Sequence, residues 1–421
     1  MEVLERLVGD VALPRMARVK QLFDDDHIAD VAGAVTQAMG RVDDRIRPGM
    51  SIALAVGSRG LADLPTLVSA TVAALKARGA EPFIVPGMGS HGGATDEGQK
   101  KLLAGLGVTE ESAGCPIRSS METVELGALP NGLPVLMDAE AMQADGIAIL
   151  NRVKPHTSFS AEIESGLAKM ISIGLGKQRG AESCHAMGFA YMAENVLEMA
   201  KIKLAKAPFL FGVASVENSY DRICRVEVIP AEAILSEEPA LLSEARRRLP
   251  RIMFDPLDVL VIDRMGKEYS GTGMDPNITG RATTPYLAPR LQVAKMVVLD
   301  LAGTSGNACG VGLADTTTRR LFDKIDFVST YANHLTSTTL GGAKIPMIME
   351  NDRLAIYAAA KTANVLDLKA LRMVRIPNTL HIGEVLISEA LVPEAEANPG
   401  VEVVSEPAPW RFDNAGELAA F

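Results

Sequence analysis

Cysteine is scarce in this chain of 421 residues, and its four copies lie far apart. Cys115, Cys184, Cys224 and Cys309 show no CxxC spacing. The sequence therefore predicts neither a zinc ribbon nor a local iron–sulfur motif. Separate free thiols are typical of a reducing compartment, so we expect a cytoplasmic protein.

Long apolar runs and excess positive charge are also missing. No run reaches the ~20 apolar residues of a membrane-spanning helix, and the first residues do not resemble a secretory signal. We therefore expect no membrane partner. The formal net charge of -10 argues against nucleic acid, because a polyanion is bound by clustered Lys and Arg. The one basic run, Arg246-Arg247-Arg248, is predicted to end a helix.

The length predicts more than one hydrophobic core, and hydrophobic residues make up 48% of the chain, which is enough to fill two. We expect two α/β domains with mostly parallel sheets and an active site in the cleft between them. Residues 1–250 would form an N-terminal catalytic and cofactor-binding domain. Residues 251–421 would form a C-terminal α/β domain on the substrate side, whose last segment is able to pack back on the first domain.

Apolar runs alternate with amphipathic stretches along both halves, and this alternation predicts parallel sheets covered by helices. In the first half we expect strands at 51–56, 81–86, 146–153, 208–216 and 225–229, and helices at 64–78, 96–106, 161–173 and 231–248. In the second half we expect strands at 258–263 and 294–301, with further helices and strands at 315–324, 344–349 and 353–362.

Three chemically useful side chains each follow a predicted strand: Arg59, His91 and His156. Ligands bind at the carboxyl ends of strands in such sheets, so we expect the three to converge on one edge. Each also has a structural interpretation. Gly57-Ser58-Arg59-Gly60 is either a tight turn or a clamp for an anion, because glycine lets the backbone approach and arginine offers a planar fork.

The sequence around each histidine supports a functional role to a different degree. His91 stands in the run Gly87-Met88-Gly89-Ser90-His91-Gly92-Gly93, and a core histidine rarely needs so permissive a backbone. His156 follows a proline in Asn151-Arg152-Val153-Lys154-Pro155-His156. Lys169 could extend from an apolar helix to water, and His185 by itself supports a structural role equally well.

Taken together, the order His91, His156, Lys169, His185 resembles the nickel-dependent lactate racemase family of 2-hydroxy-acid racemases and epimerases. The resemblance covers the N-terminal half well and the C-terminal half loosely. It implies a nickel-pincer nucleotide, of the pyridinium mononucleotide type, tethered covalently to Lys169 with nickel on His185. It implies that His91 and His156 are the acid–base pair and that Arg59 binds the substrate. Gly57 and Ser58 would contact the cofactor.

The resemblance also implies partners and a substrate class. The substrate would be a small 2-hydroxy acid, and a carboxylase, a sulfur transferase and a nickel insertase would assemble the cofactor. The family's second-domain lysine has no clear match, and polar segments stand in that half instead. They suggest a substrate more polar than lactate, such as a sugar acid, with contacts from Asn277, Arg281, Tyr331, Asn333 and His334.

Two other functions remain open from the sequence. A zinc-dependent hydrolase would use His91, His156 and His185 as metal ligands but leaves Lys169 unexplained. A non-catalytic protein that binds a sugar acid or a metal would show no turnover and would tolerate replacement of these histidines.

Overall fold

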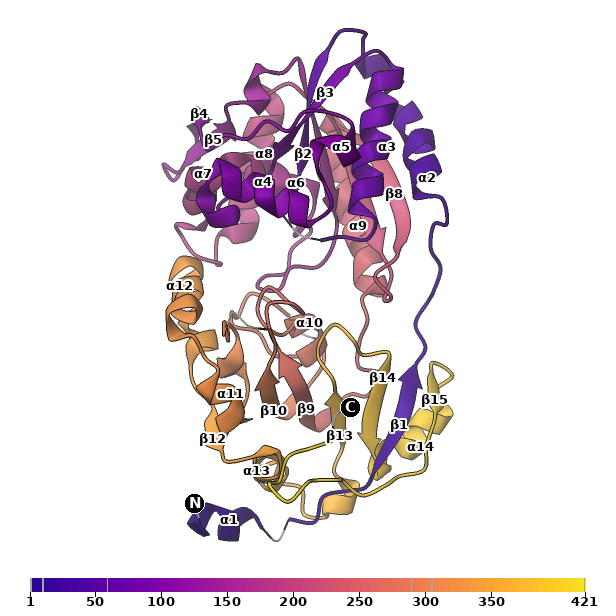
Figure 1. Cartoon of the computed structure of the whole chain (residues 1–421), viewed down its shortest axis with the longest axis vertical. Coiled ribbons are helices and arrows are strands. Elements are labelled where there is room, and N and C mark those ends of the chain that lie inside the picture. Colours follow the sequence, from indigo (N-terminus) through magenta and orange to yellow (C-terminus); the bar gives the residue numbers. More distant parts are fainter. Residues whose placement is uncertain (1, 10, 59, 289, 304–305, 420) are drawn as a thin grey trace. The chain divides into compact units, whose positions relative to one another are not determined.

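The computed structural model describes residues 2–9, 11–58, 60–288, 290–303, 306–419 and 421 (Figure 1). The chain divides into two compact units. The first unit is Asp24–Leu249, and the second unit combines Met1–Phe23 with Pro250–Phe421. Both are α/β units with mixed, mostly parallel sheets, which confirms the predicted fold class.

The first unit is built on a five-stranded sheet of order β3-β2-β6-β7-β8. The first four strands in this order run parallel and β8 is antiparallel to β7. The strands are β2 (Ser51–Val56), β3 (Glu81–Pro86), β6 (Gly146–Arg152), β7 (Phe209–Glu217) and β8 (Ile223–Pro230), and a separate hairpin pairs β4 (Thr123–Ala128) with β5 (Pro134–Asp138). The strands predicted at 51–56 and 81–86 are β2 and β3 residue for residue.

Helices cover both faces of this sheet, which explains why its strands are almost continuously apolar. Along β2, Ala53 and Ala55 face one core, whereas Ile52, Leu54 and Val56 face the other. The helices are α2 (Val31–Ala38), α3 (Leu64–Ala77), α4 (Asp96–Gly105), α5 (Glu110–Ala113), α6 (Leu167–Ser172), α7 (Lys177–His185), α8 (Met192–Lys206) and α9 (Ile234–Arg248).

The helix predicted at 161–173 is wrong at its start. The helix α6 begins only at Leu167, after Gly166 in an extended conformation. Ser165 instead pairs with Lys154 in an isolated β-bridge, so Ser165 and Lys169 do not share a helix face. The residues before α6 are held by the side chain of Glu164, and a contact of that kind is not visible in a hydrophobic pattern.

The second unit contains an eight-stranded sheet of order β12-β11-β10-β9-β13-β14-β1-β15. Parallel pairing runs from β12 to β13, and the last three strands pair antiparallel. The strands are β1 (Met16–Gln21), β9 (Leu257–Met265), β10 (Val293–Leu301), β11 (Thr316–Thr318), β12 (Met347–Met349), β13 (Met373–Ile376), β14 (Glu384–Ser388) and β15 (Val401–Val403).

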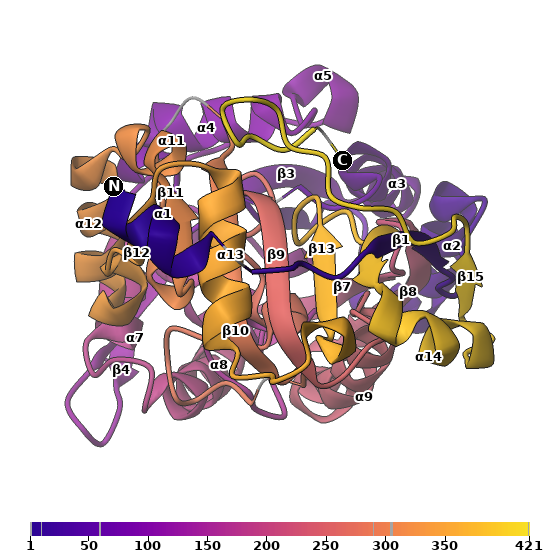
Figure 2. The ribbon, with the colours of Figure 1, turned by 90° about the horizontal axis from the view of Figure 1, so that it is seen from below.

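The helices of the second unit are α1 (Glu2–Val8), α10 (Pro276–Thr279), α11 (Arg319–Asp323), α12 (Phe327–Ser337), α13 (Asp352–Thr362) and α14 (Val392–Ala397). Figure 2 shows α13 lying along β9 and β10 with α1 beside it. Val259 and Val261 of β9 face α13, and Leu260 and Ile262 face the opposite core.

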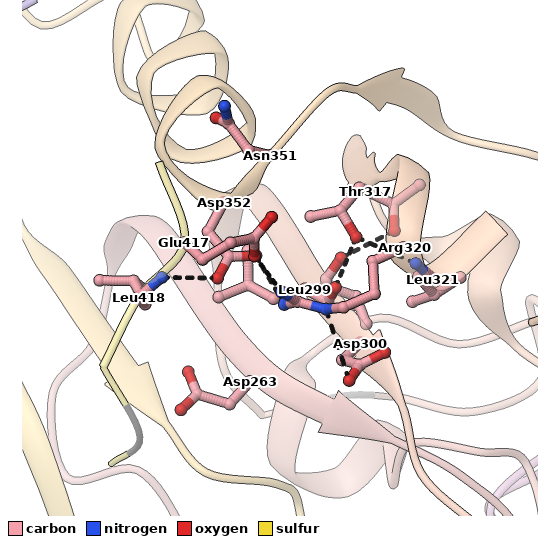
Figure 3. Close-up of polar contacts among 12 residues, drawn as sticks. Asp263, Leu299, Asp300, Thr317, Arg320, Leu321, Asn351, Asp352, Glu417 and Leu418 are labelled. Atoms are coloured by element: carbon pink, nitrogen blue, oxygen red, sulfur yellow. Dashed lines mark hydrogen bonds and ion pairs between the residues drawn. The ribbon is translucent and has the colours of Figure 1, made fainter. Parts of the chain in front are cut away.

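The division into units differs from the expected one at the start of the chain. β1 lies between β14 and β15, so the first 23 residues pack with those from Pro250 onward. The last segment packs on the second unit as well: Arg320 binds Asp352 and Glu417, and the Leu418 N–H donates to Asp352 at 2.9 Å (Figure 3). No helix among the described residues is long and apolar enough to span a membrane.

Candidate active site

Loops after three adjacent strands of the first unit carry the predicted site residues. Ser58 follows β2, His91 follows β3 and His156 follows β6, and the sheet order β3-β2-β6 places these strand ends side by side. The Ser58 hydroxyl is hydrogen-bonded to Nδ1 of His91, a contact that joins two of the loops. Arg59, the proposed carboxylate ligand, lies outside the described residues.

The His91 loop depends on glycine for its path. Gly92 has φ +68°, and a Cβ there would lie 2.7 Å from the backbone of Gly98. Gln99 of α4 is fully buried, and its amide donates to the carbonyls of Gly89 at 3.0 Å and His91 at 3.3 Å. These two hydrogen bonds hold the backbone of the loop, while the side chain of His91 is exposed.

The His156 segment is held by a buried carboxylate that sequence reasoning missed. Glu164, 1% exposed, accepts the backbone N–H of His156 at 2.6 Å and that of Ala161 at 2.8 Å. Arg246 of α9 in turn binds Glu164 at 2.5 Å. Charge-assisted bonds of this kind are short and directional. They fix the backbone of His156 although no helix or strand includes it.

The imidazole of His156 packs against two aromatic rings. Its centroid lies 4.4 Å from that of Phe159 and 6.2 Å from that of Phe189. The Ser158 N–H donates to Nδ1 at 3.0 Å, so the neutral ring carries its proton on Nε2. Burial holds the pKa of His156 well below 6.5, and the positive charges of Lys169 and His185 lower it further.

We expect His156 of the unliganded protein to stay neutral at pH 6.5. Its pKa is depressed because protonation would put a cation in an apolar pocket beside other positive groups. The measurement is an NMR titration of the imidazole Cε1–H, assigned with His156→Gln. A His156 midpoint at or above pH 6.5 would contradict the expectation.

Lys169 is the third residue of α6, and its side chain is half-buried. The side chain of the next residue, Met170, packs against the glycines that follow β2 and β3. A Cβ on Gly57 would lie 2.9 Å from Cε of Met170, and one on Gly87 would lie 2.5 Å from its sulfur. Gly57, expected to contact the cofactor, therefore also allows α6 to approach the sheet edge closely.

His185 ends α7, and its tautomer is fixed. Nδ1 donates to the Ala181 carbonyl at 2.7 Å, which leaves a lone pair on Nε2. Burial lowers the pKa of His185 and keeps that lone pair available. Metal-bound histidines are oriented by this kind of backbone bond. The ring lies 6.2 Å, edge-on, from Phe189, which also faces His156.

The available side chains fit a metal that takes most of its ligands from a cofactor rather than from the protein. Among the described residues, no three His, Cys, Asp or Glu side chains are grouped so as to hold a metal ion. A metal on His185 would need its other ligands from a bound group, and Lys169 is near enough to tether one. The three-histidine zinc site considered from the sequence finds no support in that part of the chain.

Three of the polar residues expected in the second unit, Tyr331, Asn333 and His334, lie on α12. Tyr331 is 46% exposed, and the Asn333 side chain accepts a hydrogen bond from Lys267. Lys267 lies two residues after the end of β9 and also donates to the Gly271 carbonyl at 2.8 Å. The rule that selected Arg59 and His91, a useful side chain just after a strand, would also have selected Lys267.

Three of the expected substrate contacts bind the protein itself. Arg281 donates to the carbonyl of Leu313 at 2.8 Å and to that of Ala294 at 2.7 Å. Ala294 is at the amino end of β10, whereas Lys267 follows the carboxyl end of the parallel strand β9. His334 is 1% exposed and binds the Thr339 carbonyl at 2.6 Å. The Asn277 amide donates to Asp275 at 3.0 Å.

The geometry of the first unit defines an α/β protein whose candidate site lies at the carboxyl ends of parallel strands. Comparison with protein families matches residues 26–196 to the lactate racemase N-terminal domain. This segment is similar to that domain, and it contains Ser58, His91, His156, Lys169 and His185. A search of curated proteins found no match.

Two solved structures resemble the chain in fold. A protein from Thermotoga maritima is 11% identical with a TM-score of 0.54, and the match covers 84% of this chain and 97% of that one. The lactate racemase apoprotein from Thermoanaerobacterium thermosaccharolyticum is 13% identical with a TM-score of 0.52, and the match covers 87% of this chain and 99% of that one. At these identities the likeness shows the fold alone.

Proposed function

We propose that the protein is a racemase or epimerase that inverts C2 of a 2-hydroxy acid with a nickel-pincer nucleotide on Lys169. The observation that carries this proposal is that the rings of His156 and His185 both face Phe189, beside strand ends that also hold Ser58 and His91. The charge of Lys169 lowers the pKa of both histidines, as expected for a lysine of the same site. The similarity of residues 26–196 to the lactate racemase N-terminal domain also supports the proposal. The partners would be the three cofactor-assembly proteins.

The residues suit inversion through a keto intermediate. Removing a proton from C2 is difficult because the adjacent carboxylate is already anionic; the bound cofactor would supply a hydride acceptor instead. His156 is neutral, and its Nδ1 holds the lone pair that would take the hydroxyl proton of one enantiomer when the hydrogen bond from Ser158 opens. His91, oriented by Ser58, would take that of the other. Arg59 would bind the carboxylate through its planar fork.

We expect a covalent adduct on Lys169 when the protein is made in cells that assemble the cofactor. Intact-mass spectrometry should show a heavier chain, and digestion should place the added mass on Lys169. Lys169→Arg keeps the charge but should abolish the adduct, whereas Lys201→Arg, at an exposed surface lysine, should not. Active protein with only the unmodified mass would refute the proposal.

The substrate is proposed to be more polar than lactate, with Asn333, Tyr331 and Lys267 as its contacts from the second unit. A site built to bind hydroxyl groups rejects analogues that lack them, because its polar groups lose their partners. The loaded enzyme should therefore have a kcat/KM at least about tenfold higher on aldonic acids than on lactate.

Asn333→Ala should reduce that preference. The matched control is Thr336→Ala on the same helix, because the Thr336 hydroxyl binds the carbonyl of Ala332 at 2.8 Å. Equal kcat/KM values on lactate and a panel of aldonic acids would reject a polar substrate. They would leave the covalent adduct to be judged separately.

A further inference from the structure

The helix that carries Lys169 is too short to hold itself in place. α6 has six residues, Leu167–Ser172, and isolated helices below roughly 12–15 residues are marginal in water. The N-cap is Gly166, which makes no side-chain hydrogen bond, and at the carboxyl end the Ser172 hydroxyl donates to the Lys169 carbonyl at 3.4 Å. The backbone groups at both ends must therefore be satisfied by other elements.

At the amino end, the partner is a buried carboxylate from α9. Glu238 is 1% exposed and accepts the Ala168 N–H at 2.9 Å. It lies so close to Gly166 that a Cβ there would be 2.1 Å from its Oε1. Burial raises the pKa of Glu238 to about 7, and the N–H groups of Ala168 and Leu167 oppose that rise. Negative charge at this end also complements the helix dipole.

At the carboxyl end, the partner is a buried lysine from α8. Lys203 is fully buried, and its Nζ donates to the carbonyl of Ile171 at 2.9 Å and to that of Ser172 at 2.8 Å. These are carbonyls of the last turn of α6, which have no partner within so short a helix. Burial lowers the pKa of Lys203 to about 7, and its protonated form again matches the dipole at this end.

We propose that Glu238 and Lys203 are positioning residues that grip α6 at its two ends and thereby set the place of Lys169. This charge clamp, defined as Glu238 on α9 and Lys203 on α8, rests on the proposed tethering role of Lys169. Met170 presses α6 against the glycines of the strand ends. The clamp restrains α6 along the helix axis. The contacts of Met170 with Gly57 and Gly87 set the distance between α6 and the edge of the sheet.

Hydrogen exchange in the cofactor-free protein tests the clamp directly. Glu238→Ala should speed exchange of the amides in 167–172 by about tenfold, because the two N–H groups lose a charged acceptor. Lys203→Met keeps the length of the side chain but removes its donors, and it should loosen the same segment. Gly166→Ala should act like Glu238→Ala, since its Cβ displaces the carboxylate. Glu238→Gln keeps an acceptor oxygen and should change exchange least.

Each variant has a matched control on its own helix. Glu244→Ala removes a carboxylate of α9 that pairs with Arg225 and Arg248 instead. Lys206→Met removes a lysine of α8 that binds the Leu126 carbonyl. Both controls should leave exchange in 167–172 unchanged. If Glu238→Ala does not fold, Lys203→Met and Gly166→Ala still decide the question.

A second readout follows Lys169 itself. In cells that assemble the cofactor, Glu238→Ala and Lys203→Met should lower the fraction of chains with an adduct on Lys169 by about tenfold. The controls should keep wild-type occupancy, and Glu238→Gln should restore most of it. If the wild-type chain carries no adduct, the proposed function fails, while the exchange data still report whether the clamp holds α6.

Three outcomes would overturn the inference. The first is exchange in 167–172 that matches the controls in Glu238→Ala, Lys203→Met and Gly166→Ala. The second is a uniform rise in exchange across the whole first unit, because that would show general destabilisation rather than local positioning. A local rise with Lys169 occupancy at the wild-type level would also reject the positioning role, since the helix would then move without effect on its lysine.

Discussion

Replacing His91 or His156 with alanine is expected to lower turnover of the loaded enzyme by about 10²–10⁴-fold in both directions. Each histidine is the base for one enantiomer and the acid for the other, so neither direction should be spared. The measurement is kcat from each enantiomer separately. His27→Ala is the control, because His27 is exposed in the same unit and its ring contacts the Asp25 carbonyl and the side chain of Arg222.

The isotope content of the product separates this chemistry from ordinary racemisation. In heavy water, the product should contain little deuterium at C2, because the hydrogen leaves with its electron pair and only the hydroxyl proton exchanges with solvent. Full deuterium incorporation in a single turnover would show proton abstraction at C2. A variant that loses one direction only would instead show that the two histidines do not share the proton transfers.

Breaking the buried ion pair beneath the His91 loop is expected to destabilise the first unit by about 3–5 kcal/mol. Nζ of Lys177 lies 2.9 Å from Oδ2 of Asp138, and both side chains are at most 1% exposed. Lys177 also donates to the Pro86 carbonyl at 2.8 Å, directly before the loop. Lys177→Met leaves a buried carboxylate without its cation.

Urea unfolding measures this loss, and the chain supplies an internal reference. The single tryptophan, Trp410, belongs to the second unit, so its emission should change at the wild-type urea concentration. Far-UV circular dichroism should show the earlier transition of the first unit. Adding Asp138→Asn to Lys177→Met should recover part of the loss, because the asparagine keeps an oxygen for the N–H groups of Glu140 and Ala141.

The surface pair Lys201–Glu198 is the comparison for this prediction. Both side chains are about half exposed, and exposed pairs contribute roughly 0–1 kcal/mol. Lys201→Ala should therefore leave the urea midpoint of the first unit's unfolding transition almost unchanged. A Lys177→Met protein as stable as Lys201→Ala would mean that the buried pair is not held as the structure places it.

Local pattern was sufficient to find most of the proposed catalytic residues. The strands at 51–56 and 81–86 are apolar after their first residue and end in glycine-rich segments, so both their limits and the positions of Ser58 and His91 followed from the sequence. The rule that parallel strand ends meet at one edge then brought His156 to the same place.

Contacts between distant residues were not predictable in this way. Arg246 and Glu164 are 82 residues apart, and their pairing decides where the His156 segment lies and why α6 starts late. The sequence marked 161–173 as one helix because hydrophobic periodicity does not report a carboxylate that captures backbone N–H groups. Arg281 had the right residue type for a substrate contact, yet its donors are directed to carbonyls of β10.

The sequence by itself determined the α/β class, the strands that end in glycine-rich loops and the spacing of histidines and lysine along the first unit. Those features depend on residues close together in the chain. Only the tertiary structure decided that β1 joins the second unit, because its partner β14 lies more than 360 residues further along. It also decided that two buried charges from α8 and α9 hold α6, since no local pattern encodes which distant side chain will cap a helix end.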